Sequence, residues 1–331
     1  MYEYVFTRLK GWVAQRKKRR HNDMPLTLLQ LPVDVICLIL LELPLHTKVL
    51  LSQTCRSMRT LLQDSRALVQ FLSPHDYFNF ISGLADALPD YVTCGLCRKL
   101  HIIDTTDLPY PPFARKSYPC SLNWTQLGCH DYGIRYRLSY QHVQLVLKYF
   151  RRQLAHQPIH DSYLSCLLQP FTAHALMFDR VAIDFTVQPR VIYGRFILHS
   201  QWEYKIRARS VLLEDIRPSN LCPHLNLTHT SNPMLRLNPL IGTVFCAFDN
   251  PGEEIYGSCT RCSTDYSILT LPGGVTIRAW QDLGNSGSPW DPYWVAQMND
   301  KDNSQFWGPS VPHQPHSIME SWKSSEASLL V

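Results

Sequence analysis

The sequence has no apolar run long enough to cross a membrane. Its longest strongly apolar stretch covers residues 35–41, between Asp34 and Glu42, whereas a spanning helix needs about 20 residues. The N-terminal residues also lack the continuous apolar core of a secretory signal. We therefore expect a soluble protein of the cytoplasm, the nucleus or both, in which the 11 cysteines are reduced thiols and not disulfides.

The familiar catalytic signatures are also missing. There is no P-loop, no GxSxG nucleophile elbow, no HExxH motif and no glycine-rich dinucleotide fingerprint. The 14 histidines create chance pairs such as His160–Asp161, but neighbours in sequence rarely converge on one reacting atom. No repeat of fixed period is present, which disfavours leucine-rich and propeller architectures. We predict a protein without catalytic activity of its own.

Positive charge is confined to the N-terminus. The chain has a net charge of +5, but residues 1–20 alone contribute +6, so the remaining 311 residues have a balance of −1. A nearly neutral body argues against the many phosphate contacts of a nucleic-acid-binding protein. We assign residues 1–24 to a basic flexible arm, which is a nuclear import signal, a loose contact with an anionic surface, or a solvated tail.

Residues 31–62 predict three short helices. Pro32 suits the first turn of a helix, Asp34 carries the favourable charge for that turn, and Pro44 ends the helix near Leu43. Two shorter helices are expected over residues 47–53 and 54–59. The first helix is apolar nearly all round, so it must be covered on two sides, and the adjacent charged arm favours a partner protein as the second wall.

The apolar side chains of this first helix are expected to divide between two contacts. The face expected to pack within the three-helix bundle carries Val35, Leu38 and Leu41. The residues left for a partner are Ile36, Ile39, Leu40 and Leu43.

The same segment resembles the F-box pattern over its whole length. It has Leu-Pro, an acid, an apolar run, Leu-Pro-Leu, and then Leu-Ser-x-x-Cys-Arg-x-Met-Arg-x-Leu at the spacing of that family. The positions that carry the match are Leu31, Pro32, Asp34, Ile39, Leu43, Leu51, Cys55, Arg56 and Leu61. Met58 stands where the family commonly has an aromatic residue, and His46-Thr47 replaces a frequent acidic residue.

The resemblance implies a three-helix module over residues 25–72 that docks on the Skp adaptor, and through it on the cullin of a ubiquitin ligase. The docking residues that it implies are Leu31, Pro32, Ile36, Ile39, Leu40 and Leu43. The remainder of the chain would then select an unknown target protein. We do not expect a membrane partner or nucleic acid.

Residues 73–300 predict an α+β target-recognition domain. Helices are expected over residues 73–88 and 140–152, the second capped by Ser139. Alternating apolar residues predict strands, mainly antiparallel, over residues 177–185, 190–206, 242–248, 265–271 and 274–280. Residues 301–331 are polar and are expected to form a disordered tail.

One group of cysteines and histidines has zinc-ligand spacing early in this domain. Zinc prefers four Cys or His ligands in a tetrahedron, and two of them usually come from one tight turn. Cys94 and Cys97 provide such a turn and His101 follows it. Cys120 or Cys129 would complete the set.

A second group is divided into two pairs. Cys222 and His224 form one pair, and Cys259 and Cys262 form the other, with 34 residues between His224 and Cys259. A sheet would have to bring the pairs together around a structural zinc ion. The alternative for both groups is buried free thiols, the state we expect for Cys37, Cys55 and Cys166.

The wider layout provides a second resemblance. An N-terminal F-box, a CxxC with a nearby His, a Cys-Pro-His-Leu stretch and the segment Trp280–Gly284 are similar to a group of filamentous-fungal F-box proteins. We therefore predict a substrate-receptor subunit of a Skp–cullin–F-box ubiquitin ligase with possible zinc staples. The alternative is a zinc-containing nucleic-acid-binding or regulatory protein.

Overall fold

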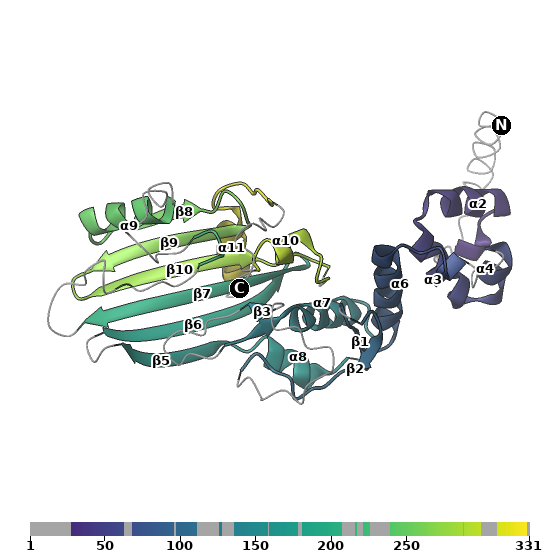
Figure 1. The fold of residues 1–331 in the computed structure, drawn as a ribbon, viewed down its shortest axis with the longest axis horizontal. Helices are drawn as coiled ribbons and strands as arrows, with labels where there is room; N and C mark the ends of the chain where they lie inside the picture. The colour runs from purple at the N-terminus through teal and green to yellow at the C-terminus, as the bar shows by residue number, and fades with distance from the viewer. Residues whose placement is uncertain are drawn as a thin grey trace. The chain divides into compact units, whose positions relative to one another are not determined.

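The chain folds into two compact units, Met1–Asp76 and Tyr77–Val331, in a computed structural model (Figure 1). The residues that the structure describes are 28–62, 68–95, 97–110, 126–127, 136–157, 159–177, 181–206, 216, 221–225, 239–286, 288–298 and 310–329. The basic arm, Cys120 and Cys129 lie outside them. Within the described part, no helix has both the length and the apolar character needed to cross a membrane.

The first unit is a bundle of short helices. Its elements are the 3-10 helix η1 (Leu28–Gln30) and the helices α2 (Val33–Glu42), α3 (Leu45–Thr54) and α4 (Arg56–Leu61). Pro32 and Pro44 each directly precede a helix, and their carbonyl oxygens accept the first hydrogen bonds of α2 and α3. Cys55 precedes α4, and its sulfur accepts a hydrogen bond from the Met58 amide.

The centre of this bundle is built from Ile36, Leu40 and Met58, which are 3%, 6% and 2% exposed. Six half-buried side chains pack around them: Leu31, Leu43, Leu51, Cys55, Leu61 and Leu62. Met58 thus fills the bundle centre. The central position of Ile36 and Leu40 bears directly on which face of α2 remains open.

The second unit is built on one six-stranded sheet with the strand order β5-β6-β7-β10-β9-β8. Its strands are β5 (Phe171–Met177), β6 (Val181–Ile192), β7 (Arg195–Ile206), β8 (Glu254–Ser258), β9 (Thr264–Leu271) and β10 (Gly274–Asp282). Every neighbouring pair is antiparallel. The predicted α+β class with a mainly antiparallel sheet is confirmed.

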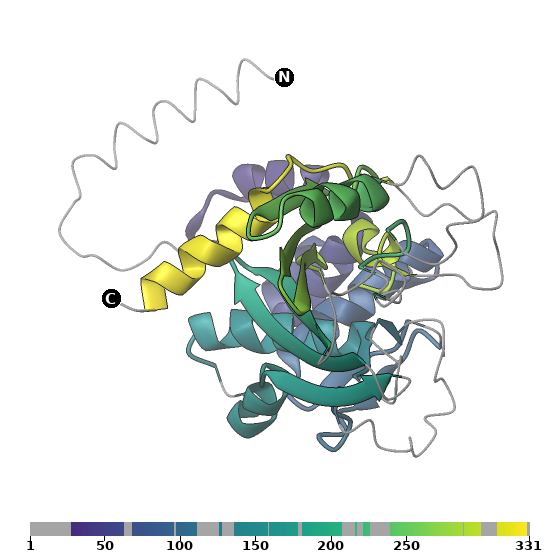
Figure 2. The same ribbon diagram turned by 90° about the vertical axis from the view of Figure 1, so that its left-hand side faces the viewer.

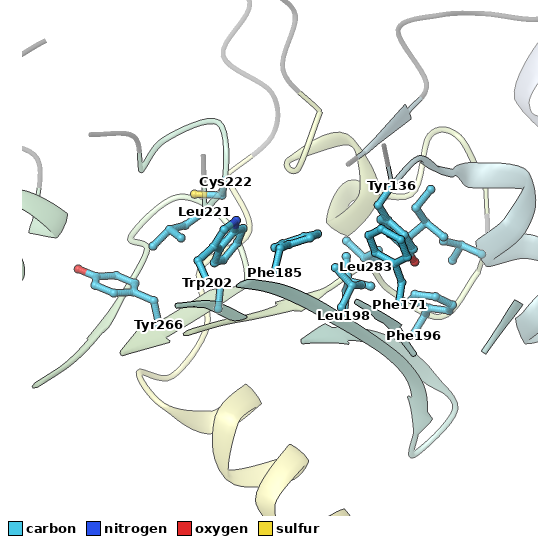
Figure 3. Close-up of a cluster of buried hydrophobic side chains, with 14 of the residues drawn as sticks. Tyr136, Phe171, Phe185, Phe196, Leu198, Trp202, Leu221, Cys222, Tyr266 and Leu283 are labelled. Carbon is cyan, nitrogen blue, oxygen red and sulfur yellow. The ribbon is translucent and has the colours of Figure 1, made fainter. Parts of the chain in front are cut away.

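One face of the sheet carries the main core of the unit. Buried and half-buried residues alternate along β6, because successive side chains of a strand point to opposite faces. Figure 3 shows Phe171, Phe185, Trp202 and Tyr266 lining the core face together with Leu221 from outside the sheet. The core therefore also fixes the 221–225 loop.

Helices and short strands complete the second unit. The helices are α6 (Pro74–Ala87), α7 (Tyr140–Leu154), α8 (Asp161–Leu167), α9 (Pro239–Asp249), α10 (Pro292–Val295) and α11 (Ser317–Leu329). The short strands are β1 (Tyr91–Thr93), β2 (Leu100–Ile102), β3 (Gln126–Leu127) and β4 (Leu138–Ser139). Ser139 begins α7 with a capping box, as its side chain accepts from the His142 amide and its own amide donates to the His142 ring.

Three predicted strands differ from the structure. The one over residues 177–185 takes in the last residue of β5 and the first five residues of β6. Residues 242–248 form part of helix α9, in which Leu240, Val244 and Ala247 face the core at helical spacing. The run over 190–206 is not one strand, because Tyr193 and Gly194 adopt positive φ angles of 50° and 73° and turn the chain between β6 and β7. The prediction also missed the edge strands β5 and β8.

The expectation of a disordered C-terminal tail is wrong for residues 310–329. This segment ends in the 13-residue helix α11, drawn in yellow in Figure 2, which contacts β6, β9 and β10. Trp322 is 2% exposed and shares an apolar cluster with Trp280 of β10. A polar composition hid this helix because few apolar side chains are enough to dock one short helix.

Lys148 is an unusual buried cation of α7. It is 2% exposed, and its Nζ donates to the carbonyl oxygens of Leu88 at 2.6 Å, Pro89 at 3.3 Å and Tyr91 at 2.6 Å. The side chain therefore fastens the chain that follows α6 to α7.

Replacing Lys148 by Met should destabilise the second unit by about 3 kcal/mol, because three carbonyl groups would lose their donor. Urea unfolding of the full chain would measure this loss. The exposed Lys205→Met variant is the control and should unfold at nearly the wild-type midpoint. Equal midpoints for both variants would contradict the assigned role of Lys148.

Candidate functional site

Helix α2 exposes an apolar stripe. Val33 is 58% exposed, Leu41 is 72% exposed, and Cys37 between them is exposed as well. These residues are four apart, so they lie along one face of the helix. Ile39 is 37% exposed beside the stripe. Exposed apolar side chains that gather on one helix face are typical of a protein-docking surface.

This arrangement corrects the expected division of the helix. Ile36 and Leu40, which were expected to meet a partner, are buried inside the bundle, and Leu31 and Leu43 pack against them. Leu41, which was expected inside, is the most exposed apolar residue of α2. The four-residue spacing of Val33, Cys37 and Leu41 is visible in the sequence, but a helix that is apolar all round gives no sign of which stripe faces inward.

Cys222, His224, Cys259 and Cys262 come together in the second unit. One ligand atom from each lies within 4.8 Å of all the others. The first two belong to the compact 221–225 loop, and the other two belong to the turn between β8 and β9. The three cysteines are buried, with Cys262 completely inaccessible. The two pairs predicted from their spacing thus meet. We call these four residues the four-residue cluster.

Backbone hydrogen bonds hold both halves of the four-residue cluster. The Leu225 amide donates to the Cys222 carbonyl at 3.2 Å, which closes the first loop. In the second turn the Arg261 amide donates to Cys259 Sγ at 3.4 Å, and the Cys259 amide donates to the Thr264 carbonyl at 2.8 Å. An amide pointing at a cysteine sulfur stabilises a thiolate, the form that binds metal.

The electrostatics of the four-residue cluster favour one shared negative charge. Hydrogen bonds from the Cys222 and Cys262 thiols lower the pKa of Cys259. Burial raises the pKa of Cys222, and its neighbouring sulfurs raise it further. A bound dication would offset the cost of burying more than one thiolate, because it compensates several negative charges at once. Three sulfurs and one imidazole nitrogen are a donor set that zinc prefers.

Cys94, Cys97 and His101 form a second group, with ligand atoms within 4.8 Å of one another. Cys97 Sγ lies 3.0 Å from His101 Nε2. The turn between them is tight, because the Cys94 amide donates to the Lys99 carbonyl and Arg98 adopts a φ of 53°. The expected fourth ligand, Cys120 or Cys129, is outside the described residues, so the structure brings three of these ligands together.

The remaining candidate pair has another role. The Nε2 atom of His160 lies 2.9 Å from a carboxylate oxygen of Asp90, and not of its neighbour Asp161. Both side chains are partly exposed at the surface, so the pair is a surface contact between α8 and the β1 region.

The comparison with protein families agrees with the first unit. A model of the F-box domain matches residues 28–70, which include α2, α3 and α4. No curated protein and no solved structure matches the chain. An F-box domain indicates a component of a Skp–cullin–F-box ubiquitin ligase, and proteins of this kind are in general non-catalytic receptors. The match and the helical bundle show that the chain contains an F-box domain at residues 28–70.

Proposed function

We propose that the chain is a substrate-receptor subunit that docks on the Skp adaptor through α2 and presents a target protein for ubiquitylation. The observation that carries the proposal is the exposed stripe of Val33, Cys37 and Leu41 inside the F-box match. An isolated module would gain nothing from these apolar side chains in water. A partner that covers them would gain the free energy of their burial.

The docking contacts are assigned by exposure. Val33, Cys37, Ile39 and Leu41 touch the adaptor directly, and Pro32 flanks them at the start of α2. Leu31, Ile36, Leu40 and Leu43 hold the helix in place from inside the bundle. Burying a fully exposed Val or Leu side chain contributes about 1.5–3 kcal/mol, so the stripe would supply several kcal/mol of the docking free energy.

The second unit would hold the target. It contributes no bond chemistry in this proposal; it raises the local concentration of target lysines near the ubiquitin-charged enzyme of the ligase. The α+β unit has a core of its own, separate from the cluster around Ile36, which suits a receptor of two parts.

Co-purification tests the function. The tagged full chain, expressed together with the Skp adaptor and a cullin, should retain both partners, with the cullin lost when the adaptor is left out. Retention of cullin without the adaptor would contradict docking through the adaptor. A well-folded full chain that retains neither partner would overturn the proposed function.

We further propose that the four-residue cluster binds a structural zinc ion. Four protein ligands would fill the tetrahedron, so this ion would hold the 221–225 loop to the β8–β9 turn. We propose a second, separate zinc site in which three of the ligands are Cys94, Cys97 and His101. The fit of both donor sets to zinc supports this proposal.

A further inference from the structure

The C-terminal segment is anchored beside the four-residue cluster. The Val311 amide donates to the carbonyl oxygen of Arg261 at 2.8 Å, and Ser263 Oγ contacts the Val311 carbonyl at 3.5 Å. Arg261 lies between two cluster cysteines, and Ser263 directly follows Cys262. The start of the segment is therefore attached to the same turn that would hold the metal.

A second anchor lies three residues beyond Cys262. The buried carboxylate of Asp265 accepts hydrogen bonds from the amides of Ile318 at 2.9 Å and Met319 at 3.2 Å, in the first turn of α11. It also contacts His313 Nε2 at 2.8 Å. A carboxylate at a helix N-terminus satisfies free amides and favours the helix dipole. Asp265 thus fixes where α11 begins.

Helix α11 depends on these anchors and on one apolar contact. An isolated 13-residue helix is marginal in water. Trp322 packs against the His199 ring, with ring centroids 5.1 Å apart, and Arg190 lies over Trp322 and pairs with Glu326 at 3.2 Å. Helix α11 covers three apolar residues of the sheet. The cluster joins Ile192, Ile197 and Trp280 of the strands to Ile318, Met319 and Trp322 of the helix. Release of α11 would uncover the three sheet residues.

The position of the Arg261 carbonyl depends on the geometry of the CxxC turn. The amide of the same residue points at Cys259 Sγ, so a change at this sulfur is transmitted to the peptide groups on both sides of Arg261. A metal ion would fix the sulfurs of Cys259 and Cys262 at one separation and tie them to the 221–225 loop. Without the ion this tie between the two loops is lost, and the turn gains freedom.

We infer that occupancy of the four-residue cluster controls the docking of residues 310–329 on the sheet. With metal bound, α11 covers Trp280 and its apolar neighbours; without metal, α11 is released and this sheet surface is exposed. The inference rests on the proposed zinc site and adds a conformational consequence to it.

Hydrogen exchange of the full chain, under reducing conditions, tests the inference. Removing zinc with a chelator should speed amide exchange in residues 317–329 about tenfold or more, while the central strands β6 and β7 keep their protection. Cys222→Ser should have the same effect, although Cys222 lies on the other loop. Cys246→Ser is the matched control, because this exposed cysteine lies outside the cluster, and it should leave exchange unchanged.

Asp265→Asn separates the two parts of the inference. This variant should release α11 and still bind zinc at the wild-type ratio. That result would show that α11 can leave the sheet while the metal stays bound. Metal-free chains whose α11 stays as protected as in the loaded chain would overturn the inference and leave the zinc site standing. A wild-type chain that binds no zinc at this cluster would overturn both.

Discussion

The double variant Val33→Asp, Leu41→Asp should lose at least about 3 kcal/mol of binding free energy for the Skp adaptor, a weakening of more than about 100-fold. Both side chains lie on the exposed stripe of α2 and are proposed to be buried in the complex. A carboxylate there would have to be desolvated without a partner, which costs more than the lost apolar contact alone. Calorimetric titration of the adaptor into the full chain measures the change.

The variant should leave the fold intact. Because both positions are exposed in the free chain, we expect its unfolding free energy to change by less than about 0.5 kcal/mol. Leu271→Asp is the matched control, because Leu271 is 50% exposed but lies on β9 of the second unit, and it should bind the adaptor normally. Equal weakening by the control and the double variant would show that the stripe is not the docking surface.

Replacing Cys262 by Ser should have the largest effect on the second unit. Cys262 is completely buried in the four-residue cluster, and a serine hydroxyl is a poor zinc ligand. Structural zinc in small domains binds with an apparent free energy of about 10–16 kcal/mol, part of which is folding free energy. We expect the variant to lose one zinc ion per chain and at least about 3 kcal/mol of stability.

Metal analysis combined with thermal unfolding checks this expectation. The wild-type chain should unfold at a lower temperature in a chelator, whereas the Cys262→Ser chain should unfold at the same temperature with or without it, apart from the contribution of the second group. Cys246→Ser serves as the control for removing a thiol and should keep both the metal content and the unfolding temperature. Unchanged metal content in Cys262→Ser would rule out the four-residue cluster as a zinc site.

The helices could be predicted where proline and capping residues mark their ends. Pro32 and Pro44 mark the two ends of α2, and Ser139 begins α7 as expected, whereas α3 begins two residues earlier than predicted, at Leu45. The inward stripe of α2 could not be predicted, because its hydrophobic residues surround the helix and carry little periodicity. Which side chains of α2 are buried depends on where α3 and α4 pack, and this is a matter of tertiary structure.

The strands were predictable where one face is buried and the other is partly open. Alternation identifies much of β6, β9 and β10, but it misleads at residues 242–248, where a mainly apolar run with β-branched and aromatic residues belongs to helix α9. Short apolar runs of this kind fit a buried helix as well as a strand. The edge strand β5 has Thr172 and His174 exposed on its outer face, and its composition gives a weak strand pattern.

The metal-ligand groups could be predicted from spacing because a CxxC turn is local. Cys222 lies close to Cys259 because of the sheet and the buried 221–225 loop. Spacing in the sequence does not predict this tertiary contact; a zinc site only presupposes it. The segment Trp280–Gly284 has a structural explanation instead of a functional one. Leu283 enters the core, Arg195 pairs with Asp282 at 2.6 Å, and Gly284, at a φ of 89°, leaves no room for a side chain beside Asp291.

The central claim is that the F-box helix α2 is the surface that meets the adaptor. Hydrogen exchange of the full chain with and without the Skp adaptor tests it most directly. Amide exchange over residues 33–42 should be slower in the complex, with no change in the strands β6 and β7 of the second unit. Binding that protects the sheet and leaves α2 unchanged, or a folded chain that does not bind the adaptor, would contradict it.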